Sequence, residues 1–184
     1  MMSLFLIILA AGESKRVNSL IPKPFQKVNN MTILEHSLNS FKGFSEIRKK
    51  VIVYNKRHKK YLRKLKLNNV IKIIGGKNRQ KSSFAALKKI KKMNCTKVLI
   101  HDAARPFPSK EVIRNLLNKL KKNHVVIPVI KISDATKRAK EDIVFKNIER
   151  NSLRFAQTPQ GFTFNKIFEK HKENINESFD DDSS

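Results

Sequence analysis

The sequence predicts an α/β fold with an open, mostly parallel sheet, helices on both of its faces and a projecting β-arm. Apolar runs without alternation, typical of strands covered on both faces, alternate along the chain with stretches of helical periodicity. This order of elements indicates parallel strands joined by helices. After residue 130 the alternation gives way to polar sequence with short apolar runs, and residues 143–148 are predicted to form a hairpin or arm beyond the sheet. A surface loop with a short hairpin is the alternative.

Each element has a local signal. The predicted strands are the apolar runs 4–9, 51–54, 70–74, 98–100 and 125–130, and the predicted helices are 33–41, 56–65, 82–93 and 110–121. Thr32 and Glu35 have the spacing of a capping box at the start of the first helix. Ser109, three residues before Val112, is predicted to begin the last of these helices.

Length and composition bound the class of protein. A chain of 184 residues predicts one domain. Its single cysteine, Cys95, excludes an intrachain disulfide and a cysteine-based zinc cage, and fits a reducing, cytoplasmic location. Residues 1–12 do not predict a secretory signal, because the first cation, Lys15, follows the apolar run instead of preceding it. No stretch approaches the roughly 18 apolar residues of a membrane span, so no membrane partner is expected.

The charge is the strongest anomaly of the composition. Forty Lys and Arg against fifteen Asp and Glu give a formal net charge of +25, which suggests a basic nucleic-acid-binding protein as one hypothesis. The lysines are spread over nearly every predicted helix, and no RNA-binding or helix-turn-helix motif accompanies them. Solvated helix faces are therefore the favoured interpretation and nucleic acid an unlikely partner, although a positive field attracts anionic substrates.

The loop after the first strand predicts a triphosphate site. Gly12 permits a tight turn whose backbone N–H groups can cradle phosphate oxygens at the carboxyl end of a strand. Arg16 offers a planar fork of donors, and Lys23 a compact charge. The segment matches neither a Walker-type loop nor the glycine-rich dinucleotide motif, and by itself an ordinary loop with surface cations explains it equally well.

Two further loops follow predicted strands. Gly75 and Gly76 precede Ser82 at a helix start, where free N–H groups favour anions. Asp102, in the loop after the strand 98–100, has the chemistry to help hold Mg²⁺ on a triphosphate or to accept a sugar hydroxyl, and a turn or cap residue is the alternative. His101 is interpreted as structural, since no nucleophile with an orienting carboxylate is evident.

Several motifs together carry a family resemblance. They are Leu9-Ala-Ala-Gly12 with Arg16, Pro22-Lys23, Gly75-Gly76 with Arg79 and Ser82, His101-Asp-Ala-Ala-Arg-Pro-Phe107, residues 134–138, Arg150-Asn-Ser-Leu153 and Gln157-Thr-Pro-Gln-Gly-Phe162. In this order they resemble the 2-C-methyl-D-erythritol 4-phosphate cytidylyltransferases, within the sugar-phosphate nucleotidyltransferases. The resemblance implies a Rossmann-like fold and transfer of a cytidylyl group from CTP to methylerythritol 4-phosphate, with release of pyrophosphate and with Mg²⁺ or another divalent cation as cofactor.

The resemblance also implies roles for individual residues. The catalytic residues would be Arg16 and Lys23; the CTP-binding residues would be Ala10, Ala11, Gly12, Gly76, Ser82 and Ala103; the residues that bind the sugar-alcohol phosphate would be Asp102, Arg105 and Arg150. Asp102 would also lie near the metal. Residues 131–153 look like the family's dimerisation arm, which would place Arg150 in the partner's site of a homodimer.

The chain departs from the family pattern at three positions. Ser14 stands where a second glycine is usual, Lys77 where an acidic residue often contacts the nucleotide, and Asp180 where a threonine is usual. The family also continues beyond the length of this chain, including a late lysine that helps to hold the second substrate. We therefore expect residues 1–184 to form a single nucleotidyltransferase domain, truncated at its C-terminus, with an intact CTP half and an incomplete site for the second substrate. A piece of a longer, bifunctional polypeptide is the alternative.

A different acceptor is the nearest alternative function. Cytidylyltransferases that act on ribitol 5-phosphate share much of this pattern of loops. Ala104 favours methylerythritol 4-phosphate, because a bulkier valine is expected there in the ribitol enzymes.

Overall fold

The computed structural model describes residues 3–12, 19–177, 179 and 181–183, and its centre is a six-stranded sheet. The strands lie in the order β5 (Val70–Ile74), β4 (Ile47–Tyr54), β1 (Leu4–Ala10), β6 (Lys97–Asp102), β12 (Gln160–Thr163) and β7 (Val125–Val126). The first four are parallel, whereas β12 is antiparallel to both β6 and β7. The predicted open and mostly parallel sheet is confirmed.

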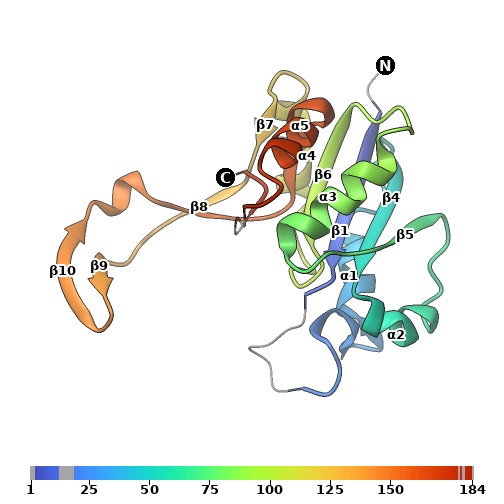
Figure 1. The fold of residues 1–184 in the computed structure, drawn as a ribbon, viewed down its shortest axis with the longest axis horizontal. Helices are drawn as coiled ribbons and strands as arrows, with labels where there is room; N and C mark the ends of the chain where they lie inside the picture. Colours follow the sequence, from blue (N-terminus) through green and yellow to red (C-terminus); the bar gives the residue numbers. More distant parts are fainter. Residues whose placement is uncertain (1–2, 13–18, 178, 180, 184) are drawn as a thin grey trace.

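Helices cover both faces of this sheet, as predicted (Figure 1). The helices α1 (Ile33–Ser40), α2 (Lys59–Arg63) and α4 (Lys110–Leu120) contribute to one core cluster, and α3 (Arg79–Ile90) and α5 (Phe164–Glu173) to the other. Three short 3-10 helices, η1 (Lys23–Phe25), η2 (Lys56–His58) and η3 (Arg150–Ser152), and a small hairpin of β2 (Lys27–Val28) and β3 (Met31–Thr32) complete these elements.

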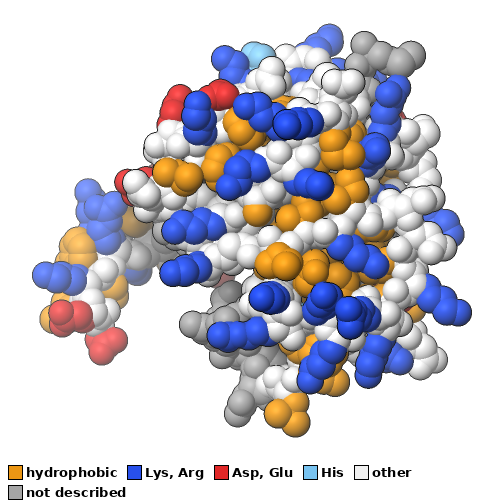
Figure 2. Space-filling view, turned by 45° about the vertical axis from the view of Figure 1, so that its right-hand side comes forward, with side chains coloured by type: hydrophobic (Ala, Val, Ile, Leu, Met, Phe, Trp, Pro, Cys, Tyr) orange, Lys and Arg blue, Asp and Glu red, His pale blue; other side chains and the backbone are white. Residues whose placement is uncertain are grey.

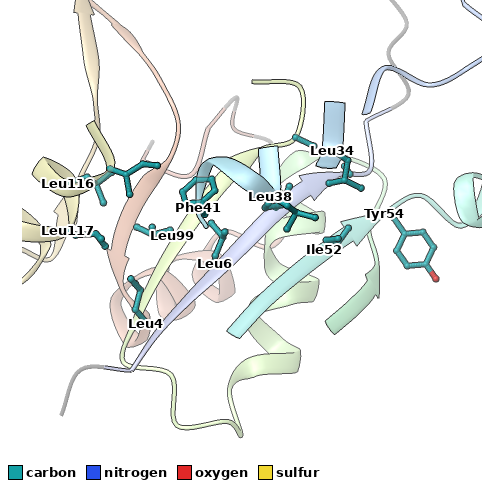
Figure 3. Packing of buried hydrophobic residues seen from close by; sticks show 14 of the residues in the cluster. Leu4, Leu6, Leu34, Leu38, Phe41, Ile52, Tyr54, Leu99, Leu116 and Leu117 are labelled. Carbon is teal, nitrogen blue, oxygen red and sulfur yellow. The ribbon is translucent and has the colours of Figure 1, made fainter. Parts of the chain in front are cut away.

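Strand β1 belongs to both cores. Leu4, Leu6 and Ile8 face one helical layer, and Phe5 and Ile7 face the other, all at most 1% exposed. Figure 3 shows the first core, where side chains of α1 and α4 lie over β1, β4 and β6. Burial on both faces explains why the sequence of β1 is uniformly apolar.

Side-chain caps begin two of the helices at the predicted residues. Thr32 Oγ1 accepts from the N–H of Glu35 at 3.2 Å, while Glu35 Oε2 accepts from the N–H of Thr32 at 2.8 Å. Ser109 Oγ accepts from the N–H of Val112 at 3.1 Å. Each cap pairs N–H groups that the first turn of a helix leaves without a partner.

The prediction for residues 125–130 was wrong in one respect. The structure divides this run into β7 and β8 (Val129–Lys131), with Pro128 between them. A proline has no N–H to donate to a ladder, so a single strand across it is disfavoured. Sequence reasoning also missed α5, although its buried residues Phe164, Ile167, Phe168 and His171 follow helical spacing.

The predicted arm is present beyond the sheet. Strands β9 (Thr136–Lys140) and β10 (Ile143–Ile148) form an antiparallel hairpin, and β8 pairs with β11 (Arg154–Ala156) at its base. Figure 1 shows the hairpin extended away from the rest of the chain. Five of its large apolar side chains are between 55% and 72% exposed, namely Ile130, Ile143, Val144, Phe145 and Phe155.

The surface charge is unevenly distributed. From Ile47 to His101 the sequence contains nineteen Lys and Arg but no Asp or Glu. This stretch includes β4, α2, β5 and α3, which come forward in Figure 2, where Lys and Arg dominate the face. Among the described residues, no helix is both long and apolar enough to cross a membrane. A face of this sign attracts anionic ligands.

Candidate active site

The polar loops singled out in the sequence meet at one edge of the sheet. β1, β5 and β6 point the same way, so their carboxyl ends, and the loops that follow them, lie together. Ligands of open α/β sheets bind at this edge.

The first loop is described only in part. Ala10 is buried at the end of β1, Ala11 is half-buried, and Gly12 is exposed. Arg16 and Ser14 lie outside the described residues. Lys23 is half-buried at the start of η1, a short helix that Pro24 and Phe25 bury against the core.

The glycine loop is packed against the first loop. A Cβ at Gly75 would come within 2.7 Å of the Ala11 Cβ and 2.8 Å of the Ser82 Oγ, so this position requires glycine. Ser82 Oγ accepts from the N–H of Gly76 at 3.1 Å and donates to the carbonyl of Asn78 at 2.8 Å. The Ser82 hydroxyl therefore holds the loop closed beside the end of β1.

Asp102 lies between two arginines at the end of β6. Its Oδ1 accepts from Nε and Nη2 of Arg79, at 3.3 and 3.2 Å, and its Oδ2 lies 3.5 Å from Nε of Arg105. Arg105 is in turn hydrogen-bonded through Nη1 to Gln157 Oε1. The structure thus places Asp102 beside Arg105 and adds Arg79, to which the sequence analysis assigned no role.

A second carboxylate completes this cluster from a distant part of the chain. Asp182 is buried after α5 and accepts from Nη1 of Arg79. Burial acts to raise the pKa of Asp182, but the hydrogen bond from His171 and the charge of Arg79 outweigh it and lower that pKa. Burial acts to lower the pKa of Arg79, and the charges of Asp182 and Asp102 raise it instead. Asp182 and Arg79 are therefore both charged at neutral pH.

His101 has a structural place, in keeping with the prediction. Its Nε2 lies 2.9 Å from the carbonyl oxygen of Arg105, which can only accept, so Nε2 carries the proton. Nδ1 then accepts from Thr158 Oγ1 at 2.9 Å, and Thr158 Oγ1 accepts from the N–H of Asp102 at 3.3 Å. Burial lowers the pKa of His101 to about 4, so the ring is neutral at pH 7. This chain of hydrogen bonds fixes the backbone on both sides of Ala103.

The remaining predicted residues lie in two different places. Ala103 is buried next to Asp102, and its N–H donates to the carbonyl of Leu9 at 3.0 Å. Arg150 lies in η3 on the arm, where its Nη1 donates to the carbonyl of Ser133 at 2.5 Å. The arm extends away from the sheet (Figure 1), and within the described part of the chain no hydrogen bond or ion pair joins Arg150 to Asp102.

A metal would find few protein ligands here. Among the described residues, no group of three His, Cys, Asp or Glu is placed to hold one. Asp102 offers a partly exposed carboxylate already paired with Arg79. Such a site fits only a cation that brings most of its oxygen ligands with it, as Mg²⁺ on a triphosphate does.

Comparison with known proteins gives a consistent result. Residues 4–184 match the family model described as IspD, 2-C-methyl-D-erythritol 4-phosphate cytidylyltransferase. The chain is 43% identical to the bifunctional enzyme IspD/IspF of Pelagibacter ubique, covering 95% of this chain and 47% of that protein. It is 34% identical to the 2-C-methyl-D-erythritol 4-phosphate cytidylyltransferase of Clostridioides difficile, covering 91% of this chain and 72% of that protein.

Solved structures agree. The 4-diphosphocytidyl-2C-methyl-D-erythritol synthase of Anaerococcus prevotii has a TM-score of 0.81 at 28% identity, over 99% of this chain and 80% of that one. The bifunctional IspDF of Campylobacter jejuni has a TM-score of 0.84 at 27% identity, over 98% of this chain and 46% of that one. The chain thus spans about half the length of the bifunctional relatives and about three quarters of the others. By sequence and by fold, it belongs to the 2-C-methyl-D-erythritol 4-phosphate cytidylyltransferase family.

Proposed function

We propose that this chain transfers the cytidylyl group of CTP to 2-C-methyl-D-erythritol 4-phosphate. A phosphate oxygen of the acceptor attacks the α-phosphorus of CTP, the bond to the bridging oxygen breaks, and pyrophosphate leaves. The observation that carries the proposal is the cluster of Asp102, Arg79 and Arg105 beside the Ala11 and Gly75 loops at one edge of the sheet. Family membership supports the same reaction.

The protein's part in this reaction is positioning and charge stabilisation. Lys23 and Arg16 would stabilise the charge that develops on the α-phosphate and the leaving group. Ala10, Ala11, Gly12, Gly76, Ser82 and Ala103 would hold CTP; the last of these would do so through its backbone, since its side chain is buried. Asp102 and Arg105 would orient the acceptor.

A divalent cation fits this scheme as a companion of the nucleotide. Mg²⁺ bound to the triphosphate would neutralise part of its charge, and Asp102 is the described side chain that would help to hold it. Removing divalent cations with EDTA should therefore stop pyrophosphate release, and adding Mg²⁺ should restore it.

The arm supports a homodimer. Its apolar side chains are exposed within one chain, and pairing with a second copy would remove them from water. A second chain would also supply what one chain lacks, because Arg150 on the arm would then reach the acceptor site of its partner. The roles of Arg150 and of residues 131–153 thus rest on the same assembly.

Pyrophosphate release tests the activity. We expect the 184-residue chain with CTP and Mg²⁺ to release pyrophosphate faster with methylerythritol 4-phosphate than with ribitol 5-phosphate. Faster release with ribitol 5-phosphate would favour the alternative acceptor. The absence of release with either acceptor would contradict the proposed activity of this chain.

Lys23→Ala tests the catalytic assignment. Loss of a charge that acts in the transition state should lower kcat by roughly a hundredfold or more. Lys27→Ala, an exposed lysine on the neighbouring strand β2, is the matched control and should leave turnover unchanged. Thermal unfolding of both variants should resemble that of the parent chain, and near-normal turnover of Lys23→Ala would argue against its role.

A further inference from the structure

A line of polar contacts connects helix α5 to the candidate site. His171 Nε2 lies 3.2 Å from Asp182 Oδ1, and Asp182 Oδ2 accepts from Arg79 Nη1. Arg79 reaches Asp102, which faces Arg105 on its other side. The side chain of Asp182 is 1% exposed and that of Asp102 is 29% exposed. A fully buried carboxylate and a solvent-facing one therefore share a single arginine.

The orientation of the Arg79 guanidinium determines which carboxylate oxygen of Asp102 it hydrogen-bonds. Nε and Nη2 both donate to Oδ1, so Arg79 does not form the usual pair of parallel bonds to two carboxylate oxygens. The third nitrogen, Nη1, is bonded to Asp182 and holds the plane of the guanidinium. The second oxygen of Asp102, Oδ2, is left on the side of Arg105.

The same arrangement controls the charge at Asp102. Arg79 faces two carboxylates, and Arg105 faces Asp102 from its other side, so two positive charges meet two negative ones. Without Asp182, Asp102 alone would face both arginines. The lowered pKa of Asp182 and the raised pKa of Arg79 agree with an ion pair between these two side chains.

We propose that Asp182 is a positioning residue for the acceptor side of the active site, acting on Asp102 through Arg79. Asp182 fixes the guanidinium so that Oδ2 of Asp102 stays on the side of Arg105, where it can also accept a hydrogen bond from a hydroxyl of the acceptor. The segment after α5, which carries Asp182, thereby helps to orient the acceptor. This inference depends on the proposed function in one respect, namely that Asp102 faces the acceptor.

A double-mutant cycle tests the inference. Asp182→Asn keeps the size of the side chain but removes its charge, and we expect it to lower kcat/KM for the acceptor about tenfold or more. In an Asp102→Asn background the same substitution should change kcat/KM by less than about twofold, because the group on which Asp182 acts is gone. KM for CTP should stay within about twofold in both backgrounds.

Two further variants separate positioning from folding. Arg79→Lys keeps the charge but cannot span two carboxylates with a planar fork, so it should reproduce both the loss and its dependence on Asp102. Glu173→Gln removes an exposed ion pair with Lys170 on the same helix and should leave kcat/KM unchanged. An equal loss from Asp182→Asn in both backgrounds, or no loss in either, would overturn the inference.

A crystal structure of the Asp182→Asn variant tests the inference independently of activity. We expect the Arg79 guanidinium to turn and to bond both oxygens of Asp102. An unchanged orientation of both side chains would overturn the inference, even if the parent chain proved active. If the parent chain released no pyrophosphate, the proposed function would fail while this structural test still gave its answer.

Discussion

At the carboxyl ends of β1 and β6 the polar side chains are held by partners within the chain, whereas on the arm of β8 to β11 the apolar side chains face outward. Asp102 is held by Arg79, and its backbone is tied to Thr158. On the arm, Ile143 and Phe145 are 72% and 60% exposed. The first region is therefore held by contacts within the chain, whereas the second leaves apolar side chains exposed to solvent.

The largest expected difference between the regions is in stability. Phe162, on β12, is 1% exposed, and Phe162→Ala should lower the free energy of unfolding by ~3–5 kcal/mol, because it leaves a cavity between β6 and α5. The same change at Phe145 should cost the monomer less than ~0.5 kcal/mol. Denaturant unfolding at low protein concentration measures the free energy of unfolding of both variants. Equal decreases for Phe162→Ala and Phe145→Ala would contradict the expected difference between the core and the arm.

The next effect concerns pH and His101. Its ordinary pKa of 6.5 is lowered to about 4 in the folded chain. Between pH 6.5 and pH 4 the His101 ring is protonated in the unfolded chain but neutral in the folded one. The free energy of unfolding should therefore be highest above pH 6.5 and fall by up to ~3 kcal/mol as the pH drops toward 4. His101→Asn should show a flatter decline over this range. His124→Asn, at an exposed position, should keep the steep decline of the parent chain.

The smallest expected effect is on association through the arm. Phe145→Asp places a charge where the proposed dimer buries an aromatic ring, and should raise the dimer Kd roughly tenfold or more. Sedimentation equilibrium measures this Kd, with Lys140→Gln on the neighbouring strand as a control of similar exposure. An unchanged Kd for Phe145→Asp would show that the arm does not form the interface.

Much of the fold was predictable because its signals are local. The uniform apolarity of residues 4–9 identified β1, and Thr32 with Glu35 located the start of α1. Pro128 separates β7 from β8 and is a local signal against one continuous strand. The buried residues of α5 have helical spacing, which is also a local signal. The break at Pro128 and the helix α5 are therefore both encoded locally in the sequence.

The site was predictable only in part because its contacts are not local. Asp102, Arg105 and Ser82 were named from their loops, and the structure brings Asp102 and Arg105 together. The link from Arg79 to Asp182 spans 103 residues, and no short motif encodes it. The hydrogen bond that joins His101 to Thr158 spans 57 residues.

The sequence alone determined the four parallel strands β1, β4, β5 and β6, the helices α1 to α4, the loops of the candidate site and the family, since each depends on periodicity, capping or motif order. Only the tertiary structure decided which side chains meet. Arg79 stands between Asp102 and Asp182 because α3, β6 and the segment after α5 converge at one edge of the sheet. That convergence is set by packing on both faces of β1, and packing depends on the whole chain at once.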